Sequence, residues 1–425
     1  MREQIKSDFY WRKLDDQAKV FSLVSNNRYS SIFRLSVILK DKITPGILQK
    51  AVEKALEIYK EFKVKMPKGL FWYYLEQNEK KPIVKIENDY PFKKINTKEN
   101  NHYLFKVTYF KNKINIDFLH TLTDGNGGKK FFKEIIYRYL ELKYPKELGC
   151  KEETIFLKNS ENAYVRNYRK CKIKREYSKK AYMIKGKQLK KGEVGITHFN
   201  IKLQEFLKCT KEQNSSLSIY LIALVTYSIY ETYYKTNYQK RPISICVPIS
   251  LQKYFSTETI SNFFSYMMIS LNEKKQRKYT FDNILEIVKK EFENKMKIEK
   301  IVKTMTSHAG LTNNIFIRLI PLFMKKFIVS IGSLELKRYY TMTVSNIGRI
   351  DVEDRYSKYV ENFFVILSPD WAEKIKCGIC SYEDTLVVTF ATILKDNLLE
   401  NKFKELLTER NITFEIERNE VSVIS

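Results

Sequence analysis

Residues 113–128 read KINIDFLHTLTDGNGG and hold the clearest structural signal in this chain of 425 residues. Apolar side chains recur at every second position from Ile114 to Phe118, which predicts a half-buried β-strand. The run GNGG at 125–128 supplies turn residues, and the apolar positions after it have the spacing of a helix. A strand, a turn and a helix in this order predict an α/β fold with His120 at the carboxyl end of its strand, where α/β sheets place reactive groups.

His120 begins the pattern HxxxDG, which Asp124 and Gly125 complete. The chain has only four histidines, so chance gives roughly 0.006 such matches per chain. A surface histidine before an Asp-Gly turn would also produce the pattern. The strand before the histidine and the helix after it favour a reactive imidazole instead. Near pH 7 an unperturbed imidazole is largely neutral, and it can therefore take a proton from a hydroxyl group.

Length and composition predict a globular protein of two lobes. A chain of 425 residues is longer than one core of ordinary size requires, and 44% of its residues are hydrophobic. Lys and Arg number 76 against 49 Asp and Glu, a net charge of +27 that favours anionic partners. Lys, Asn, Ile and Tyr are abundant along the whole chain, which indicates a general bias of composition. A local cluster of charge is therefore a stronger functional signal than the net charge.

Cysteine usage and hydropathy predict a cytoplasmic protein. The six cysteines are scattered, and the first residues lack the apolar segment of a signal peptide. The longest apolar stretch, 217–234, includes Ser218, Thr226, Ser228 and Glu231 and is too short and too polar to span a bilayer. We therefore expect a buried helix there, reduced thiols and no transmembrane segment.

Strand-like and helix-like segments interleave along the chain, which predicts mixed sheets flanked by helices. The expected organisation is an N-terminal lobe at 1–165 that carries HxxxDG, a basic connector at 166–191 and a C-terminal lobe at 192–425. In the connector a single acid, Glu176, stands among many lysines and arginines, a pattern typical of a solvated segment.

HxxxDG is the signature of coenzyme A-dependent acyltransferases related to chloramphenicol acetyltransferase, and the chain resembles this superfamily over nearly its whole length. Further segments resemble its bacterial alcohol acetyltransferase-like branch: LDD at 14–16, FRLS at 33–36, KGLFWYY at 68–74, VPISL at 247–251, SNFF at 261–264 and TMTVSNIG at 341–348. The resemblance implies a two-lobe chloramphenicol acetyltransferase-like fold. It also implies an active-site channel between the lobes, which an acyl-CoA enters from one side and an alcohol acceptor from the other.

The resemblance implies catalysis by direct transfer. His120 would act as the general base, and no acyl-enzyme would form. The TxSNxG-like segment nominates the Ser345 hydroxyl as hydrogen-bond donor to the oxyanion, with Thr343 as the alternative. Asp124 would pair with an arginine and hold the loop that presents His120.

The remaining expectations concern ligands. Gly125, Thr343 and Asn346 are the expected substrate-binding residues, and Gly125 would also permit the tight turn. We expect acyl-CoA as a co-substrate, no permanently bound cofactor and no metal. Cys377 and Cys380 form a lone CxxC without a second pair, so ordinary strand residues are expected rather than a zinc site.

Three departures from family patterns bear on these expectations. Leu119 precedes the base where condensation domains usually have a second histidine, and the DFGWG block of the plant enzymes is absent. Both favour the alcohol acetyltransferase-like branch. Gln252 follows the Val-Pro strand where related sequences often carry arginine, so Asp124 or a substrate must then be held differently.

Two other functions are compatible with the sequence. A condensation-type enzyme would take its acyl group from a carrier-protein thioester. A silent scaffold could instead bind an anionic surface or nucleic acid, although the intact HxxxDG argues against it and nucleic acid is not expected as a partner. Residues 166–191 could neutralise coenzyme A phosphates or touch a membrane. The apolar, partly basic segment 315–327 fits core packing or peripheral membrane contact.

Overall fold

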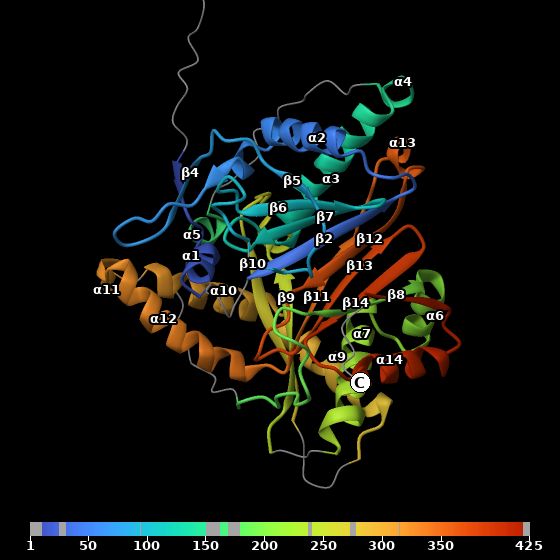
Figure 1. The fold of residues 1–425 in the computed structure, drawn as a ribbon. Coiled ribbons are helices and arrows are strands. Elements are labelled where there is room, and N and C mark those ends of the chain that lie inside the picture. The colour runs from blue at the N-terminus through green and yellow to red at the C-terminus, as the bar shows by residue number, and fades with distance from the viewer. Residues whose placement is uncertain are drawn as a thin grey trace, which may run out of the picture.

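The structure is a computed structural model that describes residues 11–24, 31–93, 95–149, 162–168, 179–236, 240–272, 278–313 and 315–419. Two mixed sheets form two lobes, and helices flank each sheet, so the predicted two-lobe α/β fold is confirmed (Figure 1). A small third sheet belongs to the first lobe and consists of β1 (Trp11–Lys13), β4 (Tyr74–Gln77) and β3 (Val64–Lys65).

The first lobe contains a five-stranded sheet with α2 (Pro45–Ile58) and α3 (Gly125–Lys143) packed together over it. Its strands in spatial order are β12 (Val360–Leu367), β2 (Ile32–Leu39), β7 (Lys113–Leu119), β6 (Phe105–Phe110) and β5 (Val84–Ile86). The short helices α4 (Pro145–Leu148), α5 (Ala163–Arg166) and α13 (Asp354–Ser357) complete this half. α2 starts at Pro45, directly after Thr44, because proline suits the first helical position.

The second lobe contains a seven-stranded sheet covered by α6 (Leu203–Glu212), α7 (Leu217–Ile229), α9 (Phe281–Lys295) and α14 (Leu398–Thr408). Its strands in spatial order are β10 (Phe264–Leu271), β9 (Ile243–Ser250), β11 (Met342–Arg349), β13 (Ile375–Tyr382), β14 (Thr385–Thr392), β8 (Gly195–Lys202) and β15 (Phe414–Arg418). α7 is the predicted buried helix, and the π-helix at Tyr230–Tyr234 continues it.

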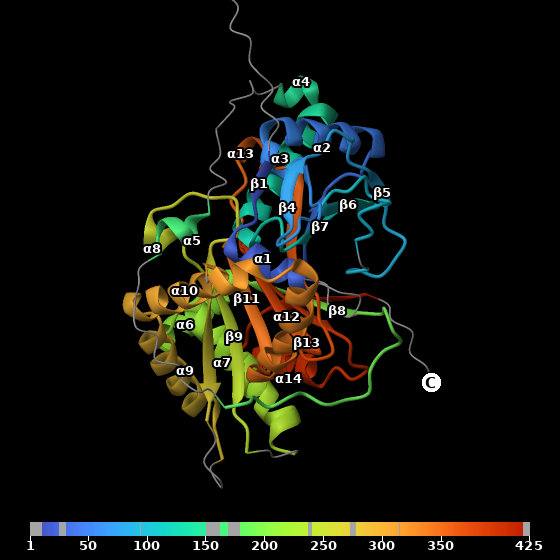
Figure 2. The same cartoon turned by 90° about the vertical axis from the view of Figure 1, so that its left-hand side faces the viewer.

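A group of helices lies at one side of the molecule, below α1 (Asp16–Val24) in Figure 1 and facing the viewer in Figure 2. It comprises α10 (Ile298–Asn313), α11 (Ile315–Leu319) and α12 (Leu322–Leu336). α12 packs against α1, and α8 (Gln252–Phe255) lies in the segment that joins β9 to β10.

The two lobes are joined by a strand from the C-terminal half of the chain. β12 pairs antiparallel with β2 in the first sheet, with Phe363 opposite Val37. It also lies close to β13 of the second sheet: a Cβ atom at Gly378 would stand 2.2 Å from the Val365 carbonyl oxygen. Only glycine permits this approach, and the sheets therefore meet along β12 and β13.

The polar face of β7 is buried as well as its apolar face, so the prediction that this strand is half-buried is wrong. Asn115 and Asp117 are 3% and 1% exposed. Asp117 accepts two hydrogen bonds from the Arg34 guanidinium, at 2.6 and 2.8 Å, and Glu87 forms a third contact with Arg34 at 2.9 Å. The polar side chains on this face of β7 therefore bind one another as charged pairs and do not face water.

The connector is described only in part, since 169–178 lie outside the described residues. Ala181, Tyr182 and Ile184 are buried, and the Tyr182 hydroxyl donates to the Tyr233 carbonyl oxygen at 2.9 Å. These three residues pack on the second lobe, whereas the described lysines of the connector are exposed, as expected of a solvated segment: Lys179, Lys180, Lys185, Lys187, Lys190 and Lys191. Farther along the chain, Cys377 and Cys380 are buried free thiols on β13, as expected of strand residues.

Candidate active site

His120 directly follows β7 and starts the turn that leads into α3. Its backbone N–H donates to the Ser31 carbonyl oxygen at 2.8 Å, which continues the pairing of β2 with β7 by one residue. The imidazole lies against two phenyl rings. Phe21 of α1 stacks on it with ring centroids 4.9 Å apart, and the Phe33 ring of β2 is 4.6 Å away. Aromatic packing therefore orients the imidazole.

The surroundings of His120 keep its imidazole neutral. Burial, with a smaller contribution from the positive charge of Lys376, lowers the pKa of His120 to about 4. Among the described residues, none is a hydrogen-bond partner for its buried Nδ1 atom. Above about pH 5 the ring is thus a neutral base that holds no proton beyond its own N–H.

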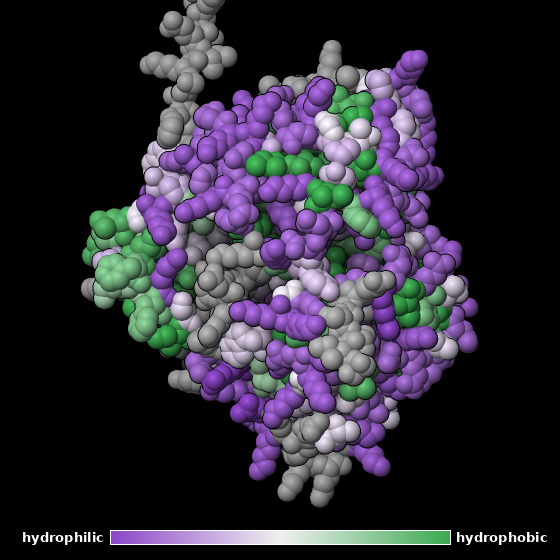
Figure 3. Space-filling view, in the orientation of Figure 1, coloured by the Kyte–Doolittle hydropathy of each residue, from purple (hydrophilic) through white to green (hydrophobic). Residues whose placement is uncertain are grey.

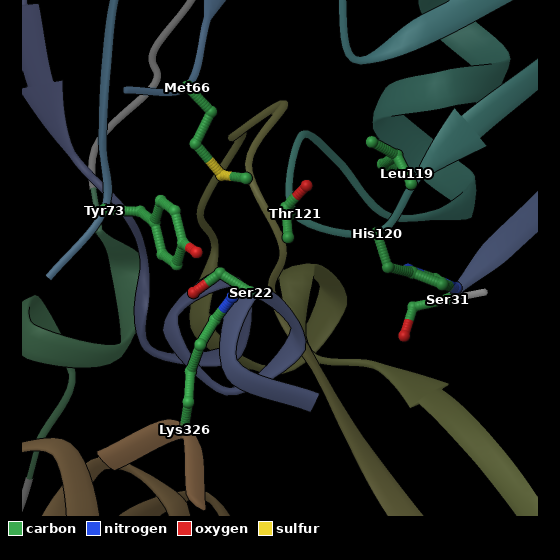
Figure 4. Close-up of a pocket in the computed structure, with 8 residues that line it drawn as sticks. All are labelled: Ser22, Ser31, Met66, Tyr73, Leu119, His120, Thr121 and Lys326. Atoms are coloured by element: carbon green, nitrogen blue, oxygen red, sulfur yellow. The ribbon is translucent and has the colours of Figure 1, made fainter. Parts of the chain in front are cut away.

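A cavity of about 120 Å³ opens beside His120 (Figure 4). Side chains from α1, from the ends of β2 and β7, from the segment around β3 and β4 and from α12 line it: Ser22, Ser31, Met66, Tyr73, Leu119, Thr121 and Lys326. Pockets that enclose a whole ligand usually measure about 300–1,000 Å³. This cavity can thus accept the reacting end of a substrate beside the imidazole.

Asp124 caps α3, and its hydrogen-bond partners among the described residues are backbone groups. One carboxylate oxygen accepts from the N–H groups of Asn126 and Gly127, both at 3.0 Å, and the other accepts from Phe263 N–H at 3.0 Å. Asp124 forms no ion pair with an arginine among the described residues, so the expected pairing of Asp124 with an arginine is wrong. Gln252, at the position where relatives often have arginine, donates to the Thr259 carbonyl oxygen at 2.7 Å. Three N–H groups hold the carboxylate instead, although burial raises the pKa of Asp124.

A segment of the second lobe, residues 259–263, holds the turn after His120. The Asn262 side chain donates to the His120 carbonyl oxygen at 2.9 Å and to the Asp15 carboxylate at 3.0 Å. The Thr123 hydroxyl donates to the Ile260 carbonyl oxygen at 2.7 Å. Asp15 and Asn262 belong to the LDD and SNFF segments, so the structure brings two distant parts of the sequence to the HxxxDG turn.

β11 carries three predicted site residues on two different faces. Thr343 and Ser345 lie two residues apart and share a face. The Thr343 hydroxyl donates to Glu373 at 2.5 Å, whereas the Ser345 hydroxyl has no hydrogen bond to any residue that the structure describes. Asn346 lies on the opposite face, and its side chain donates to Ser218 of α7 at 3.2 Å.

The far end of β11 meets the HxxxDG turn. A Cβ atom at Gly125 would stand 3.1 Å from the Ile347 side chain, and the Lys129 ammonium donates to the Ile347 carbonyl oxygen at 3.0 Å. Gly125 is the first residue of α3 and does not have a positive φ, so it permits a close approach between α3 and β11 rather than the tight turn that was expected. The residues that line the His120 cavity do not include Thr343, Ser345 or Asn346.

A buried cluster of charges near β11 was missed in the sequence. Lys376 contacts Glu373 at 3.2 Å and Asp370 at 3.6 Å, and Lys337 contacts Asp370 at 2.6 Å. Its signal was the close spacing of Asp370, Glu373 and Lys376 before an apolar strand. Glu373 of this cluster accepts the hydrogen bond from Thr343, and the positive charge of Lys376 lowers the pKa of His120.

Within the described ranges, no group of three or more His, Cys, Asp and Glu side chains is arranged to hold a metal ion. None of the helices described is both long and apolar enough to cross a membrane.

No family model matches the sequence, and no curated protein matches it either. Solved structures, in contrast, match over almost the whole chain. Polyketide synthase associated protein 5 from Mycobacterium tuberculosis is 12% identical with a TM-score of 0.62, over 93% of this chain and 97% of that one. TRI101 of F. sporotrichioides, complexed with coenzyme A and T-2, is 8% identical with a TM-score of 0.62, over 95% and 99%.

The starter condensation domain of rhizomide synthetase RzmA is a third similar structure. A variant of it, in complex with C8-CoA and Leu-SNAC, is 8% identical with a TM-score of 0.59, over 94% of this chain and 93% of that domain. Identities this low establish the fold and leave the reaction to be argued from the site. The chain therefore shares its two-lobe α/β fold with these three structures, one of which contains coenzyme A and one C8-CoA.

Proposed function

We propose that this protein is an acyltransferase that moves an acyl group, with acetyl as the first candidate, from coenzyme A to the hydroxyl group of an alcohol. One observation carries the proposal: a neutral imidazole at the end of β7, oriented by two phenyl rings, borders a cavity and is held by a loop from the other lobe. A general base must be unprotonated, fixed in orientation and beside room for a substrate, and His120 combines these three properties.

His120 would begin the reaction by taking the hydroxyl proton of the acceptor as the oxygen attacks the thioester carbonyl carbon. The attack forms a tetrahedral intermediate with a negatively charged oxygen. When that intermediate collapses, the carbon–sulfur bond breaks and the thiolate of coenzyme A takes the proton from the His120 imidazolium. The products are an ester and free coenzyme A, and His120 is neutral again.

Ser345 is the proposed hydrogen-bond donor to the oxyanion. Thr343, its neighbour on the same face of β11, already donates to Glu373, so Ser345 has the hydroxyl that is available. The positive charge of Lys376 disfavours the imidazolium but would stabilise an anionic oxygen formed nearby. Asp124, with Asn262, would act as a positioning residue for the turn that bears His120.

Coenzyme A is the proposed donor because TRI101 is complexed with it and the RzmA variant with C8-CoA. A carrier-protein thioester is the second candidate, since the fold is also that of a condensation domain. A small acyl thioester of N-acetylcysteamine can represent that alternative, because it presents the same reacting group without the nucleotide.

The purified protein should release free thiol from acetyl-CoA or octanoyl-CoA in the presence of a suitable member of an alcohol panel. His120→Ala serves as the matched blank and should release about 10²–10⁴-fold less. Equal release by both proteins with every alcohol would contradict the proposal. Release from the N-acetylcysteamine thioester alone would move the donor to the carrier-protein class.

A further inference from the structure

The surface of α11 and α12 is unusually apolar. Figure 3 shows a concentration of hydrophobic side chains over these helices, at the left of that view. The exposed side chains that form this apolar patch are Leu70, Leu319, Phe323, Phe327, Ile328 and Ile331. Leu70 comes from the loop before β4 and joins the patch because its carbonyl oxygen accepts from Leu322 N–H at 3.0 Å. A contiguous apolar patch on a protein surface usually marks an interaction site.

α12 presents its apolar side chains outward and a lysine inward. Phe323 and Phe327 are 75% and 70% exposed, one helical turn apart on the same face. Lys325 is buried: its ammonium donates to the carbonyl oxygens of Phe71 at 2.9 Å and Arg318 at 3.0 Å, and it lies over the Trp72 ring at 3.9 Å. An ordinary surface helix has the opposite arrangement. The exposed face of α12 is therefore built for contact with an apolar phase.

Charge points to an anionic membrane as the partner. Residues 315–336 include one acid, Glu335, and three basic side chains, of which Lys325 is buried and Arg318 and the half-buried Lys326 remain at the surface. Arg318 and Lys68 are exposed beside the apolar patch. α12 has 15 residues and does not meet the length needed to cross a bilayer. A short helix with Phe and Ile on one side and cations at its margin is suited to lie in the membrane interface.

The apolar patch and the candidate active site share the helix α12 and the loop before β4. Lys326 of α12 lines the His120 cavity, and its ammonium lies 5.1 Å from the centre of the Tyr73 ring, which lines the same cavity. Tyr73 belongs to the loop that contains Leu70. An acceptor that leaves a membrane under the apolar patch would thus reach His120 past Tyr73 and Lys326.

We infer that α11, α12 and the loop at Leu70 form a docking surface for an anionic membrane, and that the acceptor is an apolar alcohol which enters from that membrane. The second part rests on the proposed function. The first part does not depend on catalysis, and the two parts can therefore be tested separately.

Flotation with vesicles tests the docking. The protein should bind vesicles of phosphatidylcholine with about 30% phosphatidylglycerol more strongly than pure phosphatidylcholine, and binding should weaken with salt. Phe323→Ser with Phe327→Ser should reduce binding by about tenfold or more. Phe110→Ser is the matched control, because Phe110 is exposed at the end of the β6–β7 hairpin remote from His120, and it should bind as the unaltered protein.

Binding that is absent, or insensitive to the double substitution, would overturn the docking. A dimer in solution that the double substitution separates, without vesicle binding, would assign the apolar patch to a second copy of the chain and would likewise overturn it. His120→Ala should leave vesicle binding unchanged.

Rates with two kinds of acceptor test the second part. The Phe323→Ser, Phe327→Ser protein should acylate a long-chain alcohol in vesicles at least about tenfold more slowly, and a short, water-soluble alcohol at an unchanged rate. Equal rates with the vesicle-borne alcohol would overturn membrane entry. Vesicle binding without transfer to any alcohol would leave the docking standing and refute the proposed function.

Discussion

His120 obtains its orientation from aromatic rings and its charge state from burial. Phe21 and Phe33 fix the ring, and Lys376 and the apolar surroundings disfavour the imidazolium. Such a site gives up base strength, because a pKa far below the working pH reduces the driving force for proton transfer. It gains a base that is always unprotonated when substrates arrive.

The pH profile should reveal this environment. The folded-state pKa of His120, about 4, lies below the ordinary 6.5, so the active neutral form is lost only as the pH falls through about 4. With respect to this group, kcat/KM should stay level from about pH 5 to pH 8. An acid limb with a midpoint near the ordinary value would show that the imidazole is solvated. His102→Asn is the control for histidine loss, since His102 lies in a turn with φ 67° that asparagine tolerates, and its profile should be unchanged.

Substitutions on β11 test the oxyanion donor. Ser345→Ala should lower kcat by about 10²–10³-fold and change KM little, because a donor to the oxyanion acts in the transition state. Thr343→Val removes the hydroxyl that donates to Glu373 and should have the smaller effect on kcat. The reverse order of the two effects would assign the oxyanion to Thr343. Steady-state kinetics on both variants decides the assignment.

The turn between β7 and α3 is held from both lobes. Asp124 caps α3 and also accepts Phe263 N–H, while Asn262 reaches the His120 carbonyl oxygen. The dipole of α3, a helix of 19 residues, stabilises the Asp124 carboxylate at its N-terminus. The element that presents the base is therefore fixed by backbone contacts, and a small shift of residues 259–263 would move His120.

Gly127 is the position at which this junction is most sensitive. A Cβ atom there would stand 2.2 Å from the Thr123 hydroxyl and 2.3 Å from the Ile260 carbonyl oxygen. Gly127→Ala should thus cost about 1–3 kcal/mol of unfolding free energy and reduce kcat, since the loop must retreat. Gly46→Ala in α2 is the matched control, because nothing lies within 4 Å of a Cβ atom at Gly46. This substitution should raise the unfolding free energy by up to about 1 kcal/mol. Urea unfolding and kinetics on both variants provide the measurements. Equal behaviour of the two would contradict the close packing.

At the scale of the whole molecule, the lobes are interlocked. β12 forms the edge strand of the first sheet, and β13 beside it belongs to the second. Asp15 and Arg12, at the start of the described chain, contact Asn262 and Ser261 of the second lobe. The arrangement predicts that the lobes unfold together, so a buried group in one lobe affects the stability of the whole chain.

Glu400 on α14 provides such a test. Among the described residues neither of its buried carboxylate oxygens has a hydrogen-bond partner, and burial raises its pKa from 4.5 to about 7. Because the folded-state pKa is raised, the unfolded chain loses the proton first, and stability falls as the pH rises from 4.5 to about 7. This fall should amount to about 3 kcal/mol and should be absent in Glu400→Gln.

The matched control is Glu405→Gln on the same helix, where Glu405 is exposed and contacts Lys402 at 2.8 Å. This variant should keep the pH dependence of the unaltered protein. Urea unfolding from pH 4.5 to pH 8 measures the difference. Parallel curves for Glu400→Gln and the unaltered protein would contradict the buried, unpaired carboxyl.

Local periodicity was sufficient to predict much of the fold. The strand that ends before His120, the helix that carries the apolar positions after residue 128 and the buried α7 all depend on neighbours within a few residues. Residues 125–128, which were expected to form the turn, are instead the first turn of α3. The same reasoning failed for the polar face of β7, since its burial depends on Arg34, 83 residues away from Asp117. It also failed for the buried residues Ala181, Tyr182 and Ile184 within the basic connector, because the second lobe buries them.

The sequence by itself determined the α/β alternation and the place of His120 at the end of its strand, because hydrophobic spacing and turn residues act over short distances. Only the tertiary structure decided what holds Asp124 and which way the apolar side of α12 faces. Asp124 binds Phe263 across 139 residues, and Asn262 binds Asp15 across 247. Contacts this distant leave no periodic trace, because each depends on how separate elements come together when the two lobes pack.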